Sequence, residues 1–151
     1  MSTANPNVGT WKLNAARSKF HSHQPAVKEA TLVVQAVSNQ IEVAVTATMT
    51  DGSPIVAKYT YPKEGGIGQW VGPVPVFAAD HTTVITVLNP SEVYYTILKD
   101  GKQHELRHNV ISKDGKTIRV TVKGKDSHGK LVESLAVWEK QKSRPSRSKV
   151  A

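Results

Sequence analysis

The sequence predicts an all-β protein, an antiparallel up-and-down β-barrel of about 8–10 strands. Turn signals recur at a spacing of 14 residues, at 99–101, 113–115 and 127–129, and each ends in Gly. Between the turns lie short runs rich in Val, Ile, Thr and Tyr, such as EVYYTIL and TIRVTV, in which side chains alternate with period two. Such alternation indicates half-buried strands, and regular turns between them indicate a meander. Pairing the first strand with the last would remove the exposed edges.

Bulk composition narrows the possible classes of protein. The 151 residues predict one barrel domain over residues 1–140, followed by a basic, disordered tail over 141–151. Of the net charge of +8, five positive charges lie in 140–151; without them the charge is an ordinary +3, so no nucleic-acid partner is expected. No apolar run reaches the ~20 residues of a membrane helix. Without cysteine, disulfides and thiolate chemistry are excluded.

The location of the protein in the cell is left open by the sequence. The N-terminal residues MSTANPNVG contain no apolar stretch and so predict no signal peptide. The chain as it stands is expected in the cytoplasm, and in the periplasm or outside the cell if a leader has been removed. A monomer or a homodimer is expected.

Turn types predict the pairing of the strands. If each K-D-G or S-H-G turn is a three-residue loop with Gly in the left-handed conformation, every hairpin has one defined register. A turn at Asp51-Gly52 likewise directs Glu42 and Lys58 to the surface. The predicted pairs are Val43–Tyr59, Ile41–Tyr61, Tyr94–Leu106, Thr96–His104, Val110–Ile118, His108–Val120, Leu106–Val122, Ile118–Trp138, Val120–Ala136 and Val122–Ser134. The same register places Glu92 across from His108. It also places Glu105, Lys123 and Glu133 in one row on the outer face.

Residues 104–108 read HELRH, the H-E-x-x-H pattern of zinc metalloproteases. That chemistry requires a helix, on which two histidines four residues apart share one face. On a strand rising about 3.3 Å per residue, His104 and His108 would stand about 13 Å apart. Zinc with ligands at about 2 Å cannot join them. Alternation also sends Glu105 to the opposite face, so no metal site is predicted.

The predicted register turns apolar side chains inward together with a few polar ones. Apolar walls with a few convergent polar groups are typical of a small-molecule site. The alternative is that these groups fill a packed interior and bond to one another or to buried water. The candidate ligand-binding residues are Tyr59, Tyr61, Trp70, Tyr94, Thr96, His104, Leu106, His108, Val120 and Ser134.

A second hypothesis is a small cofactor-free enzyme, a lyase, isomerase or hydrolase. Glu92 opposite His108 would orient the imidazole and raise its basicity for general-base work. Tyr94 or His104 would then donate a hydrogen bond to a developing oxyanion. Glu92 directly follows Asn89-Pro90-Ser91 and could equally be a solvated residue at a strand start.

Two further features stand outside the strands. His21 and His23 form an H-x-H in the one segment with room for a helix or lid, residues 15–27, where a surface pair is the simpler interpretation. Trp70 lies in the Gly/Pro-rich run GIGQWVGPVPVF, which predicts irregular structure or an edge strand. There it would gate the barrel mouth or cover its rim.

The two ends of the chain resemble a known superfamily. Asn7, Gly9 and Trp11 match the N-x-G-x-W signature of the lipocalins, in which the Trp plugs the closed end of the barrel. VGTWKL and AVWEKQ are similar to the first and last strands of the intracellular fatty-acid-binding proteins, which with the lipocalins make up the calycins. GTWKLNAARSKF, SKDGKT and VWEKQ together resemble small bacterial lipocalin-like proteins, a group without a settled activity.

The resemblance implies a ligand-binding barrel, with one departure. Fatty-acid-binding proteins hold the ligand carboxylate with an inward Arg-x-Tyr on the last strand, where this chain has Ala136 and Trp138. That anchor is missing, so a fatty acid is not implied. The leading expectation is a barrel that binds a small apolar or aromatic molecule without a cofactor.

Overall fold

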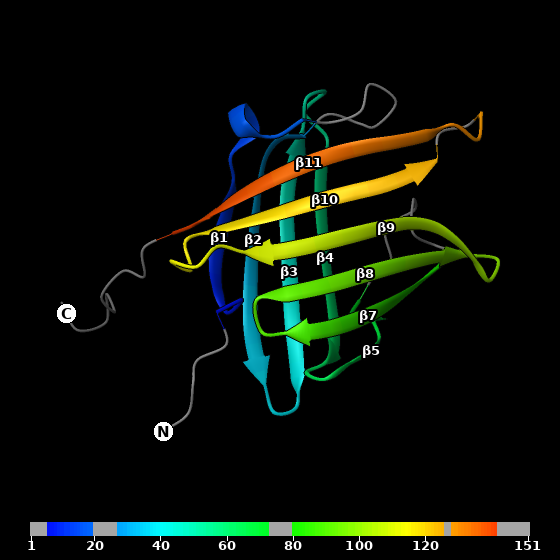
Figure 1. Ribbon diagram of the computed structural model, residues 1–151. Coiled ribbons are helices and arrows are strands. Elements are labelled where there is room, and N and C mark those ends of the chain that lie inside the picture. The colour runs from blue at the N-terminus through cyan, green and yellow to red at the C-terminus, as the bar shows by residue number, and fades with distance from the viewer. Residues whose placement is uncertain (1–5, 20–26, 73–79, 126–127, 142–151) are drawn as a thin grey trace, which may run out of the picture.

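The computed structural model describes residues 6–19, 27–72, 80–125 and 128–141. Within these residues eleven strands form one antiparallel sheet that curls into a nearly closed barrel (Figure 1), as the sequence predicts. No helix in this part of the chain has both the length and the apolar character to span a membrane. The strands are β1 (Gly9–Leu13), β2 (Val27–Val37), β3 (Gln40–Met49), β4 (Pro54–Pro62), β5 (Gly65–Ile67), β6 (Gln69–Trp70), β7 (His81–Asn89), β8 (Glu92–Lys99), β9 (Lys102–Ile111), β10 (Thr117–Lys125) and β11 (Leu131–Lys140).

The barrel is closed at two seams. The first strand pairs with the last, β1 with β11, and this confirms the predicted closure. At the other seam, the short strands β5 and β6 bridge the two remaining edges: β5 pairs with β7, and β6 pairs with β4. Backbone hydrogen bonds from Gly68 N to Thr83 O at 2.9 Å and from Val71 N to Lys58 O at 2.8 Å tie this bridge to both sides. The second seam is therefore bridged only at a few positions, Tyr59 and Thr60 of β4 and 84–86 of β7, and the barrel is nearly rather than fully closed.

The N-x-G-x-W signature occupies the position that the resemblance implies. Trp11 is fully buried, and its Nε1 donates a hydrogen bond to the backbone oxygen of Asn7 at 2.9 Å. The Asn7 amide in turn donates to the Tyr61 hydroxyl at 3.4 Å. Lys140 lies over the outer side of the indole, with Nζ 5.5 Å from the ring centroid. The Trp side chain thus closes one end of the barrel.

Two hairpins adopt the predicted registers. In the β3–β4 hairpin Val43 pairs with Tyr59 and Ile41 with Tyr61, and the Lys58 ammonium lies 3.3 Å from the Glu42 carboxylate on the outer face. In the β10–β11 hairpin the pairs Ile118–Trp138, Val120–Ala136 and Val122–Ser134 all form. Lys123 and Glu133 also form the expected outer ion pair, at 3.8 Å.

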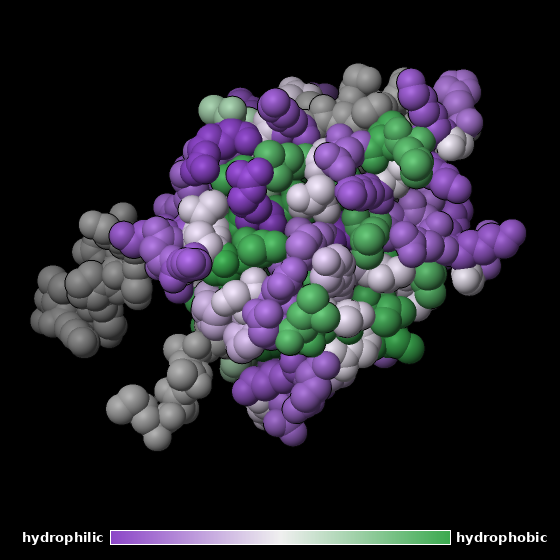
Figure 2. Space-filling view, viewed as in Figure 1, coloured by the Kyte–Doolittle hydropathy of each residue, from purple (hydrophilic) through white to green (hydrophobic). Residues whose placement is uncertain are grey.

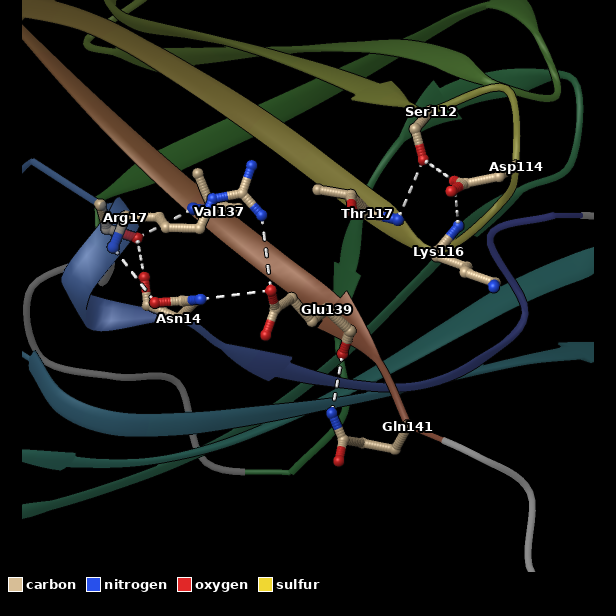
Figure 3. A network of polar contacts seen from close by, with 10 residues as sticks. Asn14, Arg17, Ser112, Asp114, Lys116, Thr117, Val137, Glu139 and Gln141 are labelled. Carbon is tan, nitrogen blue, oxygen red and sulfur yellow. Dashed lines mark hydrogen bonds and ion pairs between the residues drawn. The ribbon is translucent and has the colours of Figure 1, made fainter.

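The predicted register of β9 against β10 is wrong by one residue. Ile118 pairs with Ile111, not with Val110, and Val120 pairs with Asn109, not with His108. The connecting loop contains four residues, 113–116, in place of the three assumed. Its length is stabilised by Asp114, which accepts hydrogen bonds from the Ser112 hydroxyl at 2.6 Å and from Lys116 N at 3.0 Å (Figure 3). Because side chains alternate along a strand, this shift reverses the face that each residue of β9 presents.

The predicted register of β8 against β9 is wrong by two residues. Tyr94 pairs with His108 and Thr96 with Leu106. Asp100 and Gly101, both with positive φ, form a two-residue turn between paired Lys99 and Lys102. A β-bulge between this turn and the rest of the hairpin then adds one further residue, His104.

The interior is filled unevenly. One buried cluster holds the larger side chains, Trp11, Val34, Ile41, Val43, Tyr61, Ile85, Val93, Tyr95, Ile111, Ile118 and Val120. It lies toward the strand ends joined by the β2–β3, β7–β8 and β9–β10 connections. Toward the opposite ends the inward positions of β2, β3 and β4 carry Ala30, Ala47 and Ala57. Ala30 and Ala47 form a second, smaller buried cluster with Leu13, and Ile55, Ala136 and Trp138 pack against it.

The segment after β1 is tied to the outside of β11. It contains one turn of 3-10 helix, η1 (Ala15–Arg17), and Lys19 forms an isolated bridge with Leu135. The Asn14 amide and the Arg17 guanidinium both reach the Glu139 carboxylate, at 3.2 and 3.4 Å (Figure 3). The predicted lid therefore begins as a short anchored turn. His21, His23 and residues 142–151 of the predicted tail lie outside the described residues.

Gly65 at the second seam provides a test of closure. Its φ is +101°, and a Cβ there would lie 2.7 Å from the backbone oxygen of Ile85. Gly65→Ala is therefore expected to lower the free energy of unfolding by about 2 kcal/mol or more in chemical denaturation. Gly101→Ala is the control, because Gly101 also has positive φ but open space around it, and should cost about 1 kcal/mol. Equal costs for the two variants would contradict the close approach at the seam.

Candidate functional site

The HELRH segment lies on β9, so the motif is on a strand, as predicted. Its orientation follows from its neighbours. Arg107 pairs with the buried Tyr95 of β8, and Ile111, four residues further on, is itself in the core. Glu105, Arg107 and Asn109 therefore face into the barrel, and Leu106 and His108 face outward. Glu105, Arg107 and Asn109 are called the polar stripe below.

Four candidate ligand-binding residues consequently lie on the outer face. Tyr94, Thr96, Leu106 and His108 were expected to line the interior, and that expectation is wrong for all four. The cause is the four-residue loop after β9, which shifts its register against β10 by one residue and so reverses its faces. The two-residue difference against β8 preserves the alternation, so the reversal extends to Tyr94 and Thr96. His104 is the bulge residue, and its ring meets that of His81 with a centroid separation of 5.3 Å.

The other candidates are placed as predicted. Tyr59 and Tyr61 face inward from β4, and Val120 and Ser134 are buried inward residues of β10 and β11. Trp70, on the bridging strand β6, packs edge-on against Tyr59 with the ring centroids 5.8 Å apart. It therefore belongs to the second seam and contacts the interior. Whether any of these residues binds a ligand remains a prediction.

Three tyrosines form one cluster inside the barrel. Tyr95 contacts Tyr59 and Tyr61 edge-on, at centroid separations of 6.3 and 6.0 Å. Burial raises the pKa of Tyr59 to about 12 and also raises the pKa values of Tyr61 and Tyr95. The positive charge of Arg107 opposes the rise in the Tyr59 pKa, as expected of a guanidinium that faces this phenol. The Arg107 and Tyr59 side chains therefore face the same part of the interior.

The polar stripe combines a charge pair with an unpaired amide. Arg107 Nε donates to the Glu105 carboxylate, whose side chain is only 15% exposed. The Arg107 side chain is 44% exposed although it points inward. Its terminal nitrogens have no partner among the residues that the structure describes. Solvent therefore reaches the interior at this level, where the guanidinium presents free hydrogen-bond donors.

Several apolar side chains at inward positions are only partly buried. Leu32, Val45 and Val122 sit at inward positions near the middle of their strands, yet they are only partly buried. Tyr59, Ala136 and Trp138 behave in the same way. Inward residues in a solidly packed barrel would be fully buried. The arrangement is an apolar and aromatic wall with one accessible cation.

The predicted Glu92–His108 pair does form, but outside the barrel. Glu92 Oε2 lies 2.6 Å from His108 Nε2, and the Tyr94 ring stacks on the imidazole with centroids 4.2 Å apart. About a third of each of the two paired side chains is exposed. On this face of β7–β11, apolar residues are interspersed with hydrophilic ones (Figure 2). The enzyme hypothesis placed this pair inside the barrel, and the geometry gives that placement no support.

A separate hollow of about 240 Å³ lies on the outside of β1–β3. Its exposed lining is polar, with hydroxyls and two opposite charges, so it differs from the apolar site expected for a barrel ligand. It is lined by Lys12, Glu29, Ala30, Thr31, Thr46, Ala47 and Thr48.

Sequence reasoning missed the residues that give the interior its polar character, namely the polar stripe and Tyr95. The alternation of β9 offers Leu106 and Val110 for the core, which favours the opposite orientation. The available signal was Ser112 with Asp114, whose hydrogen bonds hold the four-residue loop that decides the orientation.

The raised Tyr59 pKa predicts a loss of stability in alkali. An unfolded tyrosine ionises near pH 10, whereas folded Tyr59 retains its proton to about 12. The stabilisation is complete below pH 10 and declines as the pH rises toward 12, by about 2 kcal/mol for this side chain. Urea unfolding at pH 9 to 11.5 should show this decline, and Tyr59→Phe should reduce its slope. An identical slope in the two proteins would show that Tyr59 ionises equally easily in the folded and unfolded states.

No protein-family model and no curated protein matches the sequence. Among solved structures, the chain is similar to EF1p2_mFAP2b bound to DFHBI, with 12% identity, 90% of this chain and 94% of that chain covered, and a TM-score of 0.46. Lobster apocrustacyanin A1 is 13% identical, with 97% and 66% covered and a TM-score of 0.47, and the siderocalin Ex-FABP is 11% identical, with 90% and 71% covered and a TM-score of 0.40.

Identities and TM-scores this low do not classify the chain, and its fold is classified from its own topology. That topology is an antiparallel meander whose first and last strands pair, with the tryptophan of an N-x-G-x-W motif buried at one end. The protein is a calycin-type, lipocalin-like β-barrel.

Proposed function

We propose that this protein binds a small, largely apolar molecule inside the barrel, with the polar part of that molecule against Arg107. The observation that carries the proposal is the accessible guanidinium on an inward position of β9, facing Tyr59. Without a ligand or water beside it, a cation within an apolar wall is costly, and Glu105 compensates it only at Nε.

The wall around Arg107 suits a flat or aliphatic body. Tyr59 and Trp70 offer aromatic surfaces, and Leu32, Val45 and Val122 offer accessible apolar side chains. The neighbouring inward residues of β2–β4 include the small side chains Ala30, Ala47 and Ala57. Binding here needs neither a metal nor a covalent step, so the proposed function is non-covalent binding.

The test uses 8-anilinonaphthalene-1-sulfonate, which combines an apolar body with one anionic group. Fluorescence titration of the folded protein is expected to show saturable binding. Arg107→Leu removes a charge-assisted hydrogen bond and should weaken binding about tenfold. His108→Ala is the matched control: the next residue on the strand faces outward, and its loss should leave the affinity unchanged within about twofold.

A second variant tests whether space is present. Ala136 is an inward, partly buried residue of β11, and Ala136→Phe would place a ring in the proposed site. If the space is open, probe binding is lost while the free energy of unfolding changes by less than about 1 kcal/mol. A packed interior would instead be overfilled and destabilised by about 1–3 kcal/mol. That result, or probe binding indifferent to both Arg107→Leu and Ala136→Phe, would contradict the proposal.

A further inference from the structure

Two histidines from different strands meet at the rim of the barrel. His81 is the first residue of β7, and His104 lies near the start of β9, with β8 between the two strands. Their ring centroids are 5.3 Å apart, and the ring planes are tilted by 42°. His81 is four residues from the buried Ile85 on the same strand, so the two rings meet on the inner face of the sheet. They lie at the strand ends away from the larger buried cluster.

The β-bulge in β9 brings the second ring to this position. The bulge lies opposite Ile97 and Leu98 of β8, and it leaves His104 as the extra residue without a partner across the sheet. In a regular strand His104 would point out of the barrel, because the next residue, Glu105, points in. A bulge changes the direction of a side chain, and here the imidazole is turned toward His81.

The geometry of the two rings fits a pair of ligands around one ion. Tyr94 and His108, which stack, have centroids 4.2 Å apart and an interplanar angle of 6°. The rings of His81 and His104 are further apart and are not parallel. Zinc bound to an imidazole nitrogen at about 2.0–2.1 Å lies about 3.2 Å from the ring centre, and two such rings at the tetrahedral angle have centres about 5.2 Å apart. The observed separation matches this value.

The two rings are accessible, and their surroundings favour a cation. The His81 side chain is 16% exposed, and His104 is also only partly buried. Neither ring has a hydrogen bond with another residue that the structure describes. Asp80 Oδ1 lies 3.7 Å from His81 Nε2, and Asp80 Oδ2 lies 3.9 Å from Lys99 Nζ. A carboxylate beside a zinc-binding histidine supports the bound ion, and Lys99 offsets part of its charge.

The number of protein ligands is limited to two. Within the described parts of the chain, no group of three or more His, Cys, Asp or Glu side chains is arranged to hold a metal ion. Water would fill the remaining coordination positions, so the ion would be exchangeable. We propose that His81 and His104 form a two-histidine site for Zn²⁺ at the inner rim of the barrel. His104 of the HELRH segment thus has its partner ligand on another strand, in place of His108. The site is independent of the binding of an apolar molecule proposed above.

The test is calorimetric titration of the full-length protein with Zn²⁺. The double variant His21→Ala/His23→Ala serves as the reference protein beside the wild type, so that the H-x-H of the sequence does not contribute. One Zn²⁺ per chain is expected in this reference. His81→Ala and His104→Ala, each made in the reference, should weaken binding at least about tenfold, because even the loss of a group that supports a zinc ligand costs about 10–100-fold.

His108→Ala is the matched control. It removes the same type of side chain from the same strand, but on the outer face, and the affinity for Zn²⁺ should stay within about twofold. Zn²⁺ should also raise the Tm of the reference protein and of this control, because the ion binds the folded state. It should leave the Tm of His81→Ala and His104→Ala unchanged. If either alanine variant does not fold, His81→Gln or His104→Gln takes its place and keeps a polar side chain.

Three results would overturn the proposal. The first is Zn²⁺ binding by the wild type that disappears in the reference protein, which would assign the ion to His21 and His23. The second is a reference protein whose affinity for Zn²⁺ is unaffected by a substitution at His81 or at His104. The third is the absence of Zn²⁺ binding by the wild type.

Discussion

The length of the loop between β9 and β10 is the constraint on which the interior depends. Four residues, held by the hydrogen bonds of Ser112 and Asp114, set Ile111 opposite Ile118. A loop one residue shorter would direct Leu106 and His108 inward and the polar stripe, Glu105, Arg107 and Asn109, outward. The hydrogen bonds are on the surface, yet they decide whether the barrel contains imidazoles or a guanidinium. A local turn thus determines the chemistry of the proposed site.

Closure and packing then divide the barrel into two parts. Trp11, Tyr61 and the isoleucines of the larger cluster fill one end, and this end supplies most of the buried apolar area. At the other end the second buried cluster, formed by Leu13, Ala30 and Ala47, is smaller and contributes less burial. The polar stripe runs between the two parts, with Asn109 beside the larger cluster and Glu105 toward the opposite end. The larger cluster therefore supplies most of the stability, and the proposed binding site lies in a different section of the same strands.

The sequence predicted the architecture well because alternation and turn spacing report directly on a meander. It predicted the hairpins around Asp51-Gly52 and 127–129, the closure by β1 and β11, and the burial of Trp11. It failed on β9, where Leu106 and Val110 lie on the outer face and the hydrophobic pattern therefore favours the wrong orientation. The orientation is decided by the four-residue loop after β9, while the two-residue turn and the bulge at His104 change its pairing with β8 by two residues and keep the faces. Four of the ten candidate ligand-binding residues lie outside for that reason, and Glu92 and His108 form their pair on the surface.

The most direct test of the inward polar stripe is cysteine scanning along β9, because the chain has no native cysteine. Single substitutions at Glu105, Leu106, Arg107, His108, Asn109 and Val110 would each be labelled with a small thiol reagent, with and without bound 8-anilinonaphthalene-1-sulfonate. The bound probe should slow labelling at Glu105, Arg107 and Asn109 and leave the three even-numbered positions unaffected. Protection at Leu106 and His108 in their place, or at no position, would contradict both the orientation of β9 and the proposed site.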